Sequence, residues 1–139
     1  YNALTLYNLL SCCYYALLRS VNLSIIRVVF ISQITTATGL KLDVNECVRC
    51  KGTKEILSLS FEDGGFVCRK CYNPNRDAIS KPLYIKLVRY LFISDYKDAI
   101  NKDLPIFESE QLFDELYEFL CEQLSITSKS YKLLKKINR

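Results

Sequence analysis

Apolar residues recur at helical spacing through the N-terminal part of the chain. The spacing predicts a helix over residues 3–18. Residues 22–38 are richer in β-branched types, but this run is long for a strand and Gly39 is a natural stop just past a helix end. We therefore expect a buried helix there as well. The apolar side expected of the first helix consists of Leu6, Leu10, Tyr14, Leu17 and Leu18.

Helical spacing returns near residue 80. Ser80 is expected to cap a helix that has Pro82 in its first turn, where proline is tolerated. After a polar connection from Asp95 to Pro105, Ser109 is expected to cap the next helix, and a last, basic helix is expected over residues 128–137. The apolar stripes of these three helices are Leu83, Leu87, Val88 and Leu91; Leu112, Phe113, Leu116, Phe119 and Leu120; and Tyr131, Leu134 and Ile137.

Residues 43–73 follow a different pattern. Residues 57–61 alternate apolar side chains with serine, which is the period of a strand. The run Glu62-Asp63-Gly64-Gly65 has the composition of a turn, and Phe66 begins a return strand. We therefore expect a small β-hairpin between the helical runs.

Two cysteine pairs flank this hairpin. Cys47 and Cys50 precede it, while Cys68 and Cys71 follow its second strand. A two-residue spacer lets both sulfurs of a pair face one ion, and Zn²⁺ prefers four such ligands in a tetrahedron. The spacing therefore predicts one structural zinc ion with a closed shell of four cysteines. The cations expected to offset the negative charge of that shell are Arg49, Lys51, Arg69 and Lys70.

These patterns predict a mainly α protein. We expect residues 1–139 to form a single α-helical domain, a helical bundle, with residues 43–73 inserted as a zinc-ribbon-like, four-cysteine β-hairpin. The remaining thiols, Cys12, Cys13 and Cys121, fall in predicted helices and are expected to be buried.

Composition bears on the kind of function. The chain has no histidine, which removes every mechanism that needs an imidazole base, and no catalytic constellation is visible in its acids or glycines. We therefore expect a binding module and not an enzyme. Nine acids and two bases lie between Ile93 and Glu122, whereas residues 123–139 carry five bases and no acid. These charges can contact a partner or form ordinary solvated faces.

The N-terminal sequence and the cysteine spacing indicate the expected cellular location. The first eighteen residues lack charge, but polar residues interrupt the run, and we prefer a core helix to a membrane span. No signal peptide is visible, and the chain has no methionine, so we expect a piece of a longer protein. Metal-spaced cysteines without a secretory signal indicate a reducing, cytoplasmic location.

The order of these features resembles the C-terminal part of RecO, the bacterial recombination mediator. The most specific part is the run Gly64-Gly65-Phe66-Val67-Cys68 with Cys71 and the upstream cysteine pair. Apolar helices before this run, a leucine-rich helix after Ser80 and a closing lysine-rich helix complete the similarity, which covers nearly the whole chain.

The resemblance implies a function beyond what the residues indicate. RecO proteins bind DNA, anneal single strands, bind RecR and single-strand-binding protein, and help load RecA; much of their DNA binding belongs to an N-terminal OB fold, which would precede Tyr1. The four cysteines would be the zinc ligands. The residues that would contact phosphates or the acidic tail of single-strand-binding protein are Lys129, Lys132, Lys135, Lys136, Arg139 and Arg89.

Two other functions remain open from the residues alone. A generic zinc-ribbon adaptor in transcription or translation would carry the same cysteine doublet. A thiol redox protein can also use paired Cys-x-x-Cys motifs, although neither pair here begins a long helix after a strand.

Overall fold

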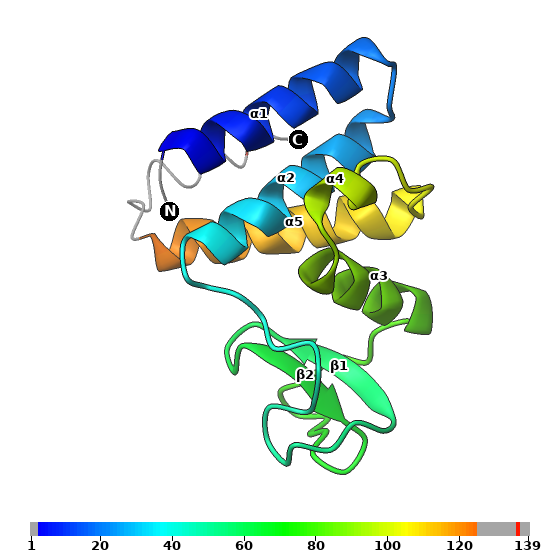
Figure 1. Ribbon diagram of the computed structural model, residues 1–139. Helices are drawn as coiled ribbons and strands as arrows, with labels where there is room; N and C mark the ends of the chain where they lie inside the picture. The colour runs from blue at the N-terminus through cyan, green and yellow to red at the C-terminus, as the bar shows by residue number, and fades with distance from the viewer. Residues whose placement is uncertain (1–2, 125–135, 137–139) are drawn as a thin grey trace.

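The helices form one body, and a two-stranded hairpin lies beside it. The computed structural model describes residues 3–124 and residue 136. In Figure 1, α2 and α5 lie side by side, α1 lies along their outer side, and the hairpin lies at the opposite end of the molecule. The prediction of a mainly helical fold with an inserted hairpin is therefore confirmed. The elements are α1 (Ala3–Leu18), α2 (Leu23–Ala37), β1 (Ile56–Ser60), β2 (Gly65–Cys68), α3 (Pro82–Ile93), α4 (Tyr96–Ala99) and α5 (Ile106–Gln123).

Helix α2 is the central element of the core. It contacts α1, α3, α4 and α5, so most of its circumference is covered. That enclosure explains its unbroken run of β-branched residues, such as Val28 and Val29, which are almost fully buried. The two buried hydroxyl groups, on Ser32 and Thr35, donate to the carbonyls of Val28 at 2.9 Å and Ile31 at 2.8 Å. The predicted buried helix is confirmed.

The predicted apolar side of α1 is wrong. Its buried residues are Leu9, Cys13 and Ala16, and four of the five residues expected to face the core are exposed. The physical reason is that α1 carries no charge and has apolar residues around most of its circumference, so its sequence period cannot select an inner face. No helix within the described residues is both long and apolar enough to cross a membrane.

Two predicted helix caps are also wrong. The residue that caps α3 is Lys81, one position after Ser80, and the Ser80 N–H donates to the carbonyl of Leu57 at 2.8 Å, which joins the start of the helix to β1. Ser109 lies inside α5, which starts after Pro105, and its buried hydroxyl has no hydrogen-bond partner in the structure.

The inner stripes of α3 and α5 were mostly predicted correctly. Leu87, Val88 and Leu91 are buried on α3, but Tyr84 takes the position expected for Leu83, which is about half exposed. On α5 the buried leucines are as expected. The connection from Asp95 to Pro105 contains the short helix α4, whose first turn Asp95 caps, and it is less polar than predicted because Ile100 and Leu104 are buried.

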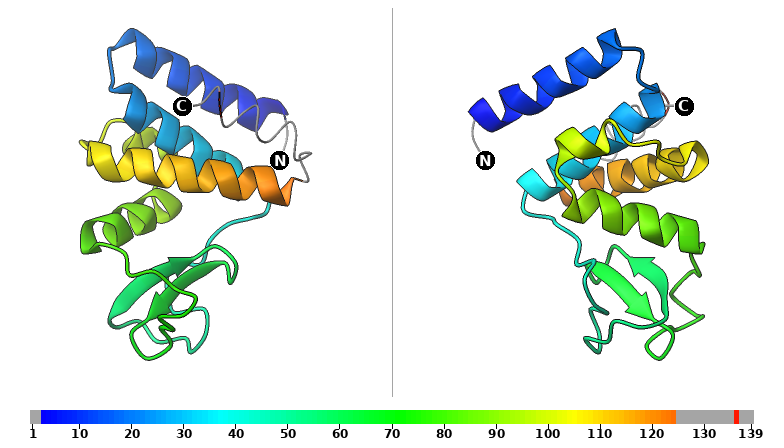
Figure 2. Two further views of the ribbon diagram at one scale, coloured as in Figure 1. Left: turned by 180° about the vertical axis from the view of Figure 1, so that it is seen from behind. Right: turned by 45° about the vertical axis from the view of Figure 1, so that its right-hand side comes forward.

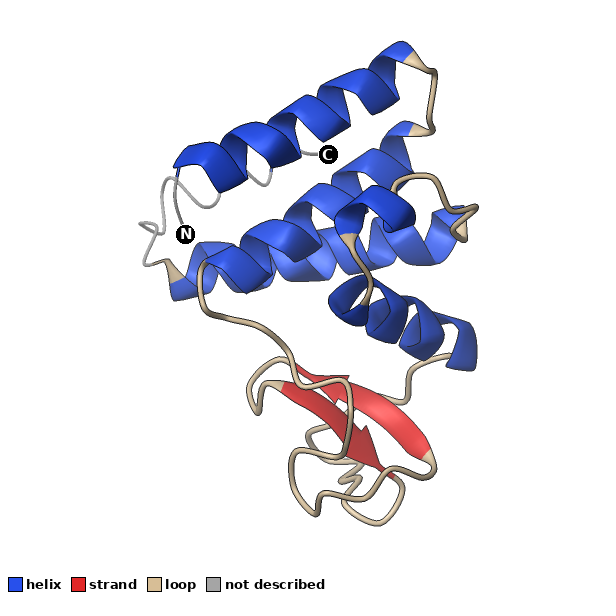
Figure 3. Cartoon of the chain, viewed as in Figure 1, coloured by secondary structure: helices blue, strands red, loops and turns tan. Residues whose placement is uncertain are grey.

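The hairpin forms as predicted, with a different inner face. β1 and β2 are antiparallel, and their register is irregular between Ile56 and Ser58. This irregularity turns Ser58 inward, where it is nearly inaccessible, while Leu57 and Leu59 remain partly exposed. Figures 2 and 3 show the hairpin projecting from the helices next to α3, with loops wrapped around its far end. The closing helix predicted over residues 128–137 lies outside the described residues, except for Lys136, which is exposed.

Candidate metal centre

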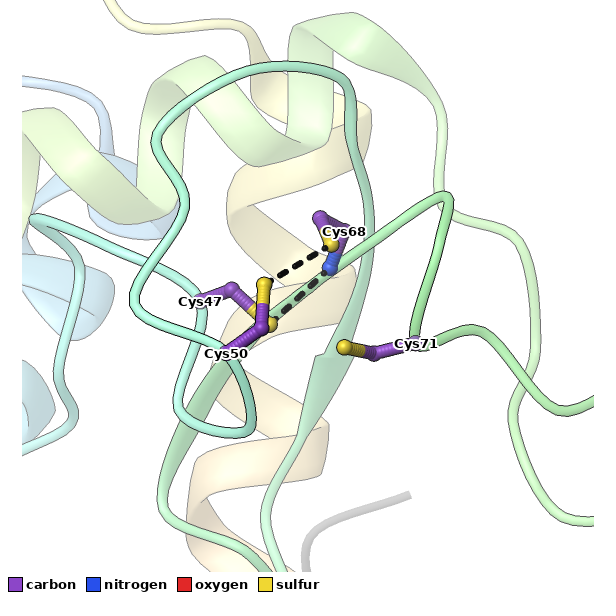
Figure 4. A group of neighbouring side chains, drawn as sticks. All are labelled: Cys47, Cys50, Cys68 and Cys71. Atoms are coloured by element: carbon purple, nitrogen blue, oxygen red, sulfur yellow. Dashed lines mark hydrogen bonds between the residues drawn. The ribbon is translucent and has the colours of Figure 1, made fainter.

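The four predicted cysteines meet at the far end of the hairpin. Their sulfur atoms all lie within 4.8 Å of one another, and the Cys50 and Cys68 sulfurs are 3.5 Å apart. Figure 4 shows Cys47 and Cys50 on one loop facing Cys68 and Cys71. A tetrahedral ion with ligands at 2.3 Å requires sulfurs about 3.8 Å apart, so the cluster fits a single ion.

A backbone pairing brings the two cysteine pairs together. The segment before Cys47 runs along the free edge of β2, where the Asp43 N–H donates to the Gly64 carbonyl at 2.8 Å and the Phe66 N–H to the Asp43 carbonyl at 3.1 Å. The Val48 N–H then bonds the Phe66 carbonyl at 2.9 Å. The first pair is therefore held against the strand that ends in Cys68.

The glycine doublet makes this pairing possible. Gly64 has φ +85°, a conformation that favours glycine, and it closes the turn between the strands. Gly65 lies so close to the incoming segment that an added Cβ would stand 2.4 Å from the Asp43 carbonyl oxygen. The first glycine is required by backbone conformation and the second by lack of space.

Backbone N–H groups point at the sulfurs, as expected of metal-binding turns. The Arg49 and Cys68 N–H groups each lie 3.4 Å from the Cys47 sulfur, and the Gly52 N–H lies 3.4 Å from the Cys50 sulfur. Such bonds stabilise thiolate over thiol, the form that binds metals.

The thiols differ in their tendency to ionise. Burial opposes ionisation of Cys47, but the N–H groups of Cys68, Cys50 and Arg49, with the Cys68 thiol, lower its pKa to about 6. Burial and hydrogen bonding to the other three cysteines raise the pKa of Cys71 to about 12. The thiol with the lowered pKa is completely buried. A redox nucleophile must be reached by its substrate, so Cys47 is poorly placed for disulfide exchange.

Arg49 joins the separate loops of the metal centre. Its guanidinium donates to both carboxylate oxygens of Asp77, at 2.7 and 3.0 Å, to Asp63 at 2.6 Å, and to the Cys71 carbonyl at 2.8 Å. This arginine holds the pKa of Asp77 at about 2 and also lowers that of Asp63. The first cysteine loop, the hairpin turn and the loop after Cys71 are thus fixed to one side chain.

The cations around the cysteines are therefore less free than the sequence suggested. Arg49 is committed to Asp63 and Asp77, Lys51 lies 3.9 Å from Glu46, and Arg69 lies 3.4 Å from Glu55. Their charge is shared with neighbouring acids and is only partly available to the thiolates. Asp77 was not identified from the sequence, although its place four residues after Asn73, whose N–H it accepts at 2.9 Å, is a recognisable local turn.

Replacing Arg49 with methionine should destabilise the hairpin by about 2–4 kcal/mol, because Asp77, only 3% exposed, would lose its bidentate partner. Arg69→Met is the matched control, since Arg69 is 67% exposed and its ion pair should contribute about 0–1 kcal/mol. Chemical denaturation of the metal-loaded protein, followed by the absorption of a Co²⁺ probe, measures both. Equal losses in the two variants would contradict this role for Arg49.

Two of the basic residues predicted to bind DNA or a partner fall within the part of the chain that the structure describes. Arg89 is exposed on α3 and Lys136 is exposed, whereas Lys129, Lys132, Lys135 and Arg139 lie outside the described residues. The structure tests none of these assignments.

An apolar groove between the helices was not predicted. It has a volume of about 550 Å³ and is walled by α2 and α5, with Cys13 contributed by α1. Arg27 lies in its wall, with the guanidinium 4.0 Å from the centre of the Phe113 ring. The sequence gives no local signal for this groove because its walls come from segments far apart in the chain.

Comparisons with known proteins identify the family of this chain. The family model "Recombination protein O C terminal" matches residues 3–132. The DNA repair protein RecO of Bacillus subtilis (strain 168) is 33% identical over 85 residues, which cover 58% of this chain and 33% of that protein. The match thus spans about a third of the relative's length, and no solved structure matches the chain significantly. Because the family model covers almost the entire chain, the protein belongs to the family formed by the C-terminal part of RecO.

Proposed function

We propose that this chain is the helical, metal-binding part of a non-enzymatic mediator of DNA recombination and repair. The observation that carries the proposal is the RecO family match over residues 3–132. The Bacillus subtilis relative is a DNA repair protein by name, and we propose the same role and a cytoplasmic location for this protein. In this proposal residues 1–139 form a single helical domain, and residues 43–73 are its inserted metal-binding unit.

The proposed metal is one structural Zn²⁺ ion bound by Cys47, Cys50, Cys68 and Cys71. Four thiolate ligands favour zinc over the harder cations, and a closed tetrahedral shell leaves no position for a reactive water. Buried Cys47 and the Arg49 network support a role in holding the hairpin together. When bound, the ion supplies folding free energy to this segment and no catalytic chemistry.

The proposed macromolecular partners are DNA, RecR and single-strand-binding protein, and the proposed outcome of their assembly is RecA loading. Single-stranded DNA would be bound mainly by an OB fold outside this chain. The basic residues proposed as additional phosphate contacts are Arg89, Lys129, Lys132, Lys135, Lys136 and Arg139.

The apolar groove is the proposed receptor for the tail of single-strand-binding protein. That tail ends in aspartates and an apolar pair, so its receptor needs a cation beside an apolar pocket. The groove offers both, because Arg27 lies against Phe113 in a wall that is otherwise almost entirely apolar. Charge steers the aspartates, and the apolar pair is removed from water.

Strand annealing by the full-length protein tests the main proposal. The protein should accelerate the pairing of complementary single strands, and the acceleration should fall steeply with salt because phosphate contacts release counterions. A full-length protein that neither anneals strands nor binds the acidic tail peptide would exclude the proposed function.

Changing Arg27 to glutamine should weaken binding of a labelled acidic tail peptide by about tenfold, the expected loss for one charge-assisted contact. Fluorescence anisotropy at low and moderate salt measures the effect. Arg89→Gln is the matched control, because it removes the same charge from an exposed site on α3. If Arg89→Gln weakens binding and Arg27→Gln does not, the receptor is on α3 and not in the groove.

A further inference from the structure

The four cysteines of the metal centre differ in their exposure to solvent. Cys50 is exposed, whereas Cys47 and Cys68 are buried and Cys71 is partly buried. A cavity of about 500 Å³ opens beside the cluster, and Cys50 and Cys68 are the two cysteines in its wall. We name it the Cys50 cavity. A small molecule that enters this cavity meets the sulfur of Cys50 first.

The surroundings of Cys50 are electropositive. Three cations, Lys54, Arg69 and Lys70, line the Cys50 cavity together with one carboxylate, Glu55. Arg69 lies 3.4 Å from that carboxylate, but neither lysine has an ion-pair partner among the residues that the structure describes. Cations beside a partly exposed cysteine favour its thiolate, and this is the environment in which protein thiols are oxidised.

A second sulfur lies next to that of Cys50, and it belongs to the other cysteine pair. The Cys50 and Cys68 sulfurs are 3.5 Å apart, and Figure 4 marks this contact with a dashed line. A disulfide requires sulfurs about 2 Å apart, so the two must approach by about 1.5 Å. Cys47 is less suited to pair with Cys50, because it is completely buried and its sulfur accepts the N–H groups of Arg49 and Cys68.

We propose that Cys50 is a site of oxidation by hydrogen peroxide and that Cys68 completes a disulfide with it, which releases the metal ion. The inference rests on the proposed metal site, because coordination keeps the cysteines as thiolates. The Cys50 thiolate attacks one peroxide oxygen, the O–O bond breaks, and a sulfenic acid and a hydroxide ion form. The Cys68 thiolate then attacks that sulfur and displaces a second hydroxide ion. The two thiolates together lose two electrons, and the peroxide gains them.

The disulfide removes two of the four metal ligands. The remaining thiolates, on Cys47 and Cys71, cannot form a closed tetrahedral shell, so the ion should leave and residues 43–73 should loosen. A dithiol reductant reverses the disulfide by exchange, so the change is reversible. The apolar groove is walled by α2 and α5 of the helical body, and its peptide binding should persist after oxidation.

The test is oxidation of the full-length, zinc-loaded protein with excess hydrogen peroxide. A coloured chelator follows the release of zinc, and mass spectrometry of proteolytic peptides identifies the linked cysteines. Zinc should be released, and the Cys50–Cys68 disulfide should be the main product. Treatment with dithiothreitol and fresh zinc should restore the original metal content.

Gly52→Ala tests whether access to Cys50 controls the reaction. Gly52 lines the Cys50 cavity, and an added Cβ would stand 3.3 Å from the Cys50 sulfur. This methyl group should slow zinc release about fivefold by shielding the sulfur, with the initial zinc content unchanged. Gly39→Ala is the matched control, because Gly39 lies just after α2 and an added Cβ there meets nothing within 4 Å.

Three results would overturn the proposal: retention of zinc in peroxide, a Cys47–Cys50 disulfide as the main product, or equal rates of release in the two glycine variants. If Gly52→Ala does not bind zinc, the disulfide map of the native protein decides alone. A native protein without metal would exclude the proposed metal site together with this inference. A protein that binds zinc and anneals strands but resists peroxide would exclude only this inference.

Discussion

Replacing Cys47 with serine should release the metal ion and unfold residues 43–73, while the helical body keeps most of its helix content. Cys47 is completely buried, and its sulfur accepts the N–H groups of Arg49 and Cys68. A structural zinc site contributes about 10–16 kcal/mol to small metal-binding folds, so losing one ligand is expected to abolish tight binding. Metal analysis after dialysis and far-ultraviolet circular dichroism measure the two effects.

The control for this change is Cys12→Ser. Cys12 is a partly buried thiol on α1 and lies outside the four-cysteine cluster. It should leave the metal content at one ion per chain. Full metal retention by Cys47→Ser, or equal metal loss in both variants, would show that the cluster does not bind the ion as proposed. A chelator applied to the native protein should reproduce the serine variant, because the hairpin has little core of its own.

Changing Gly65 to alanine should destabilise the hairpin by about 3 kcal/mol or more, the range expected of steric overlap in a packed interior. The new Cβ would stand 2.4 Å from the Asp43 carbonyl oxygen and 2.6 Å from the Val48 side chain. Relief of the overlap must move the segment that carries Cys47 away from β2. The metal should therefore bind more weakly as well, and denaturation followed by a Co²⁺ probe reports both effects.

Gly64→Ala separates backbone conformation from lack of space. Gly64 has φ +85°, but an added Cβ meets nothing within 4 Å, so alanine there should cost only about 1 kcal/mol. Gly39, just after α2, also has φ +81° and nothing within 4 Å of an added Cβ. Gly39→Ala should therefore have a similarly small cost. If Gly64→Ala proved as damaging as Gly65→Ala, the close approach of Asp43 to β2 would not be what holds the cysteine loops together.

The attachment of the hairpin to the helices gives it a fixed place beside α3 and α5. The Phe61 ring packs on the Phe119 ring with centres 5.3 Å apart, and the Ser80 N–H bonds the Leu57 carbonyl at 2.8 Å. On the helical side, buried Tyr84 donates to Glu115 at 2.6 Å. A metal ion bound by the four cysteines would therefore stiffen a unit that is itself packed onto the helical body.

The features that the sequence by itself determined are local ones. The presence of the helices, the hairpin and the two Cys-x-x-Cys turns depends on residues close together in the chain, so spacing was enough to predict them, whereas the exact starts of α3 and α5 were not predicted. The family resemblance rested on the same local run around Gly64, Gly65 and Cys68, and the family match over residues 3–132 confirms it. The identity of the metal and the roles of the basic residues stay predictions.

Tertiary structure alone decided how these elements use their surfaces. The uncharged sequence of α1 has no preferred inner face, and only its packing on α2 selects Leu9, Cys13 and Ala16 for burial and leaves the other side exposed. Likewise, Arg49 lies fourteen residues from Asp63 and twenty-eight from Asp77, so only the folded loops bring the three together. A local sequence pattern indicates which helix, strand or turn a segment can form. The contacts that the segment makes in the folded protein depend on interactions with distant segments, which its own sequence does not specify.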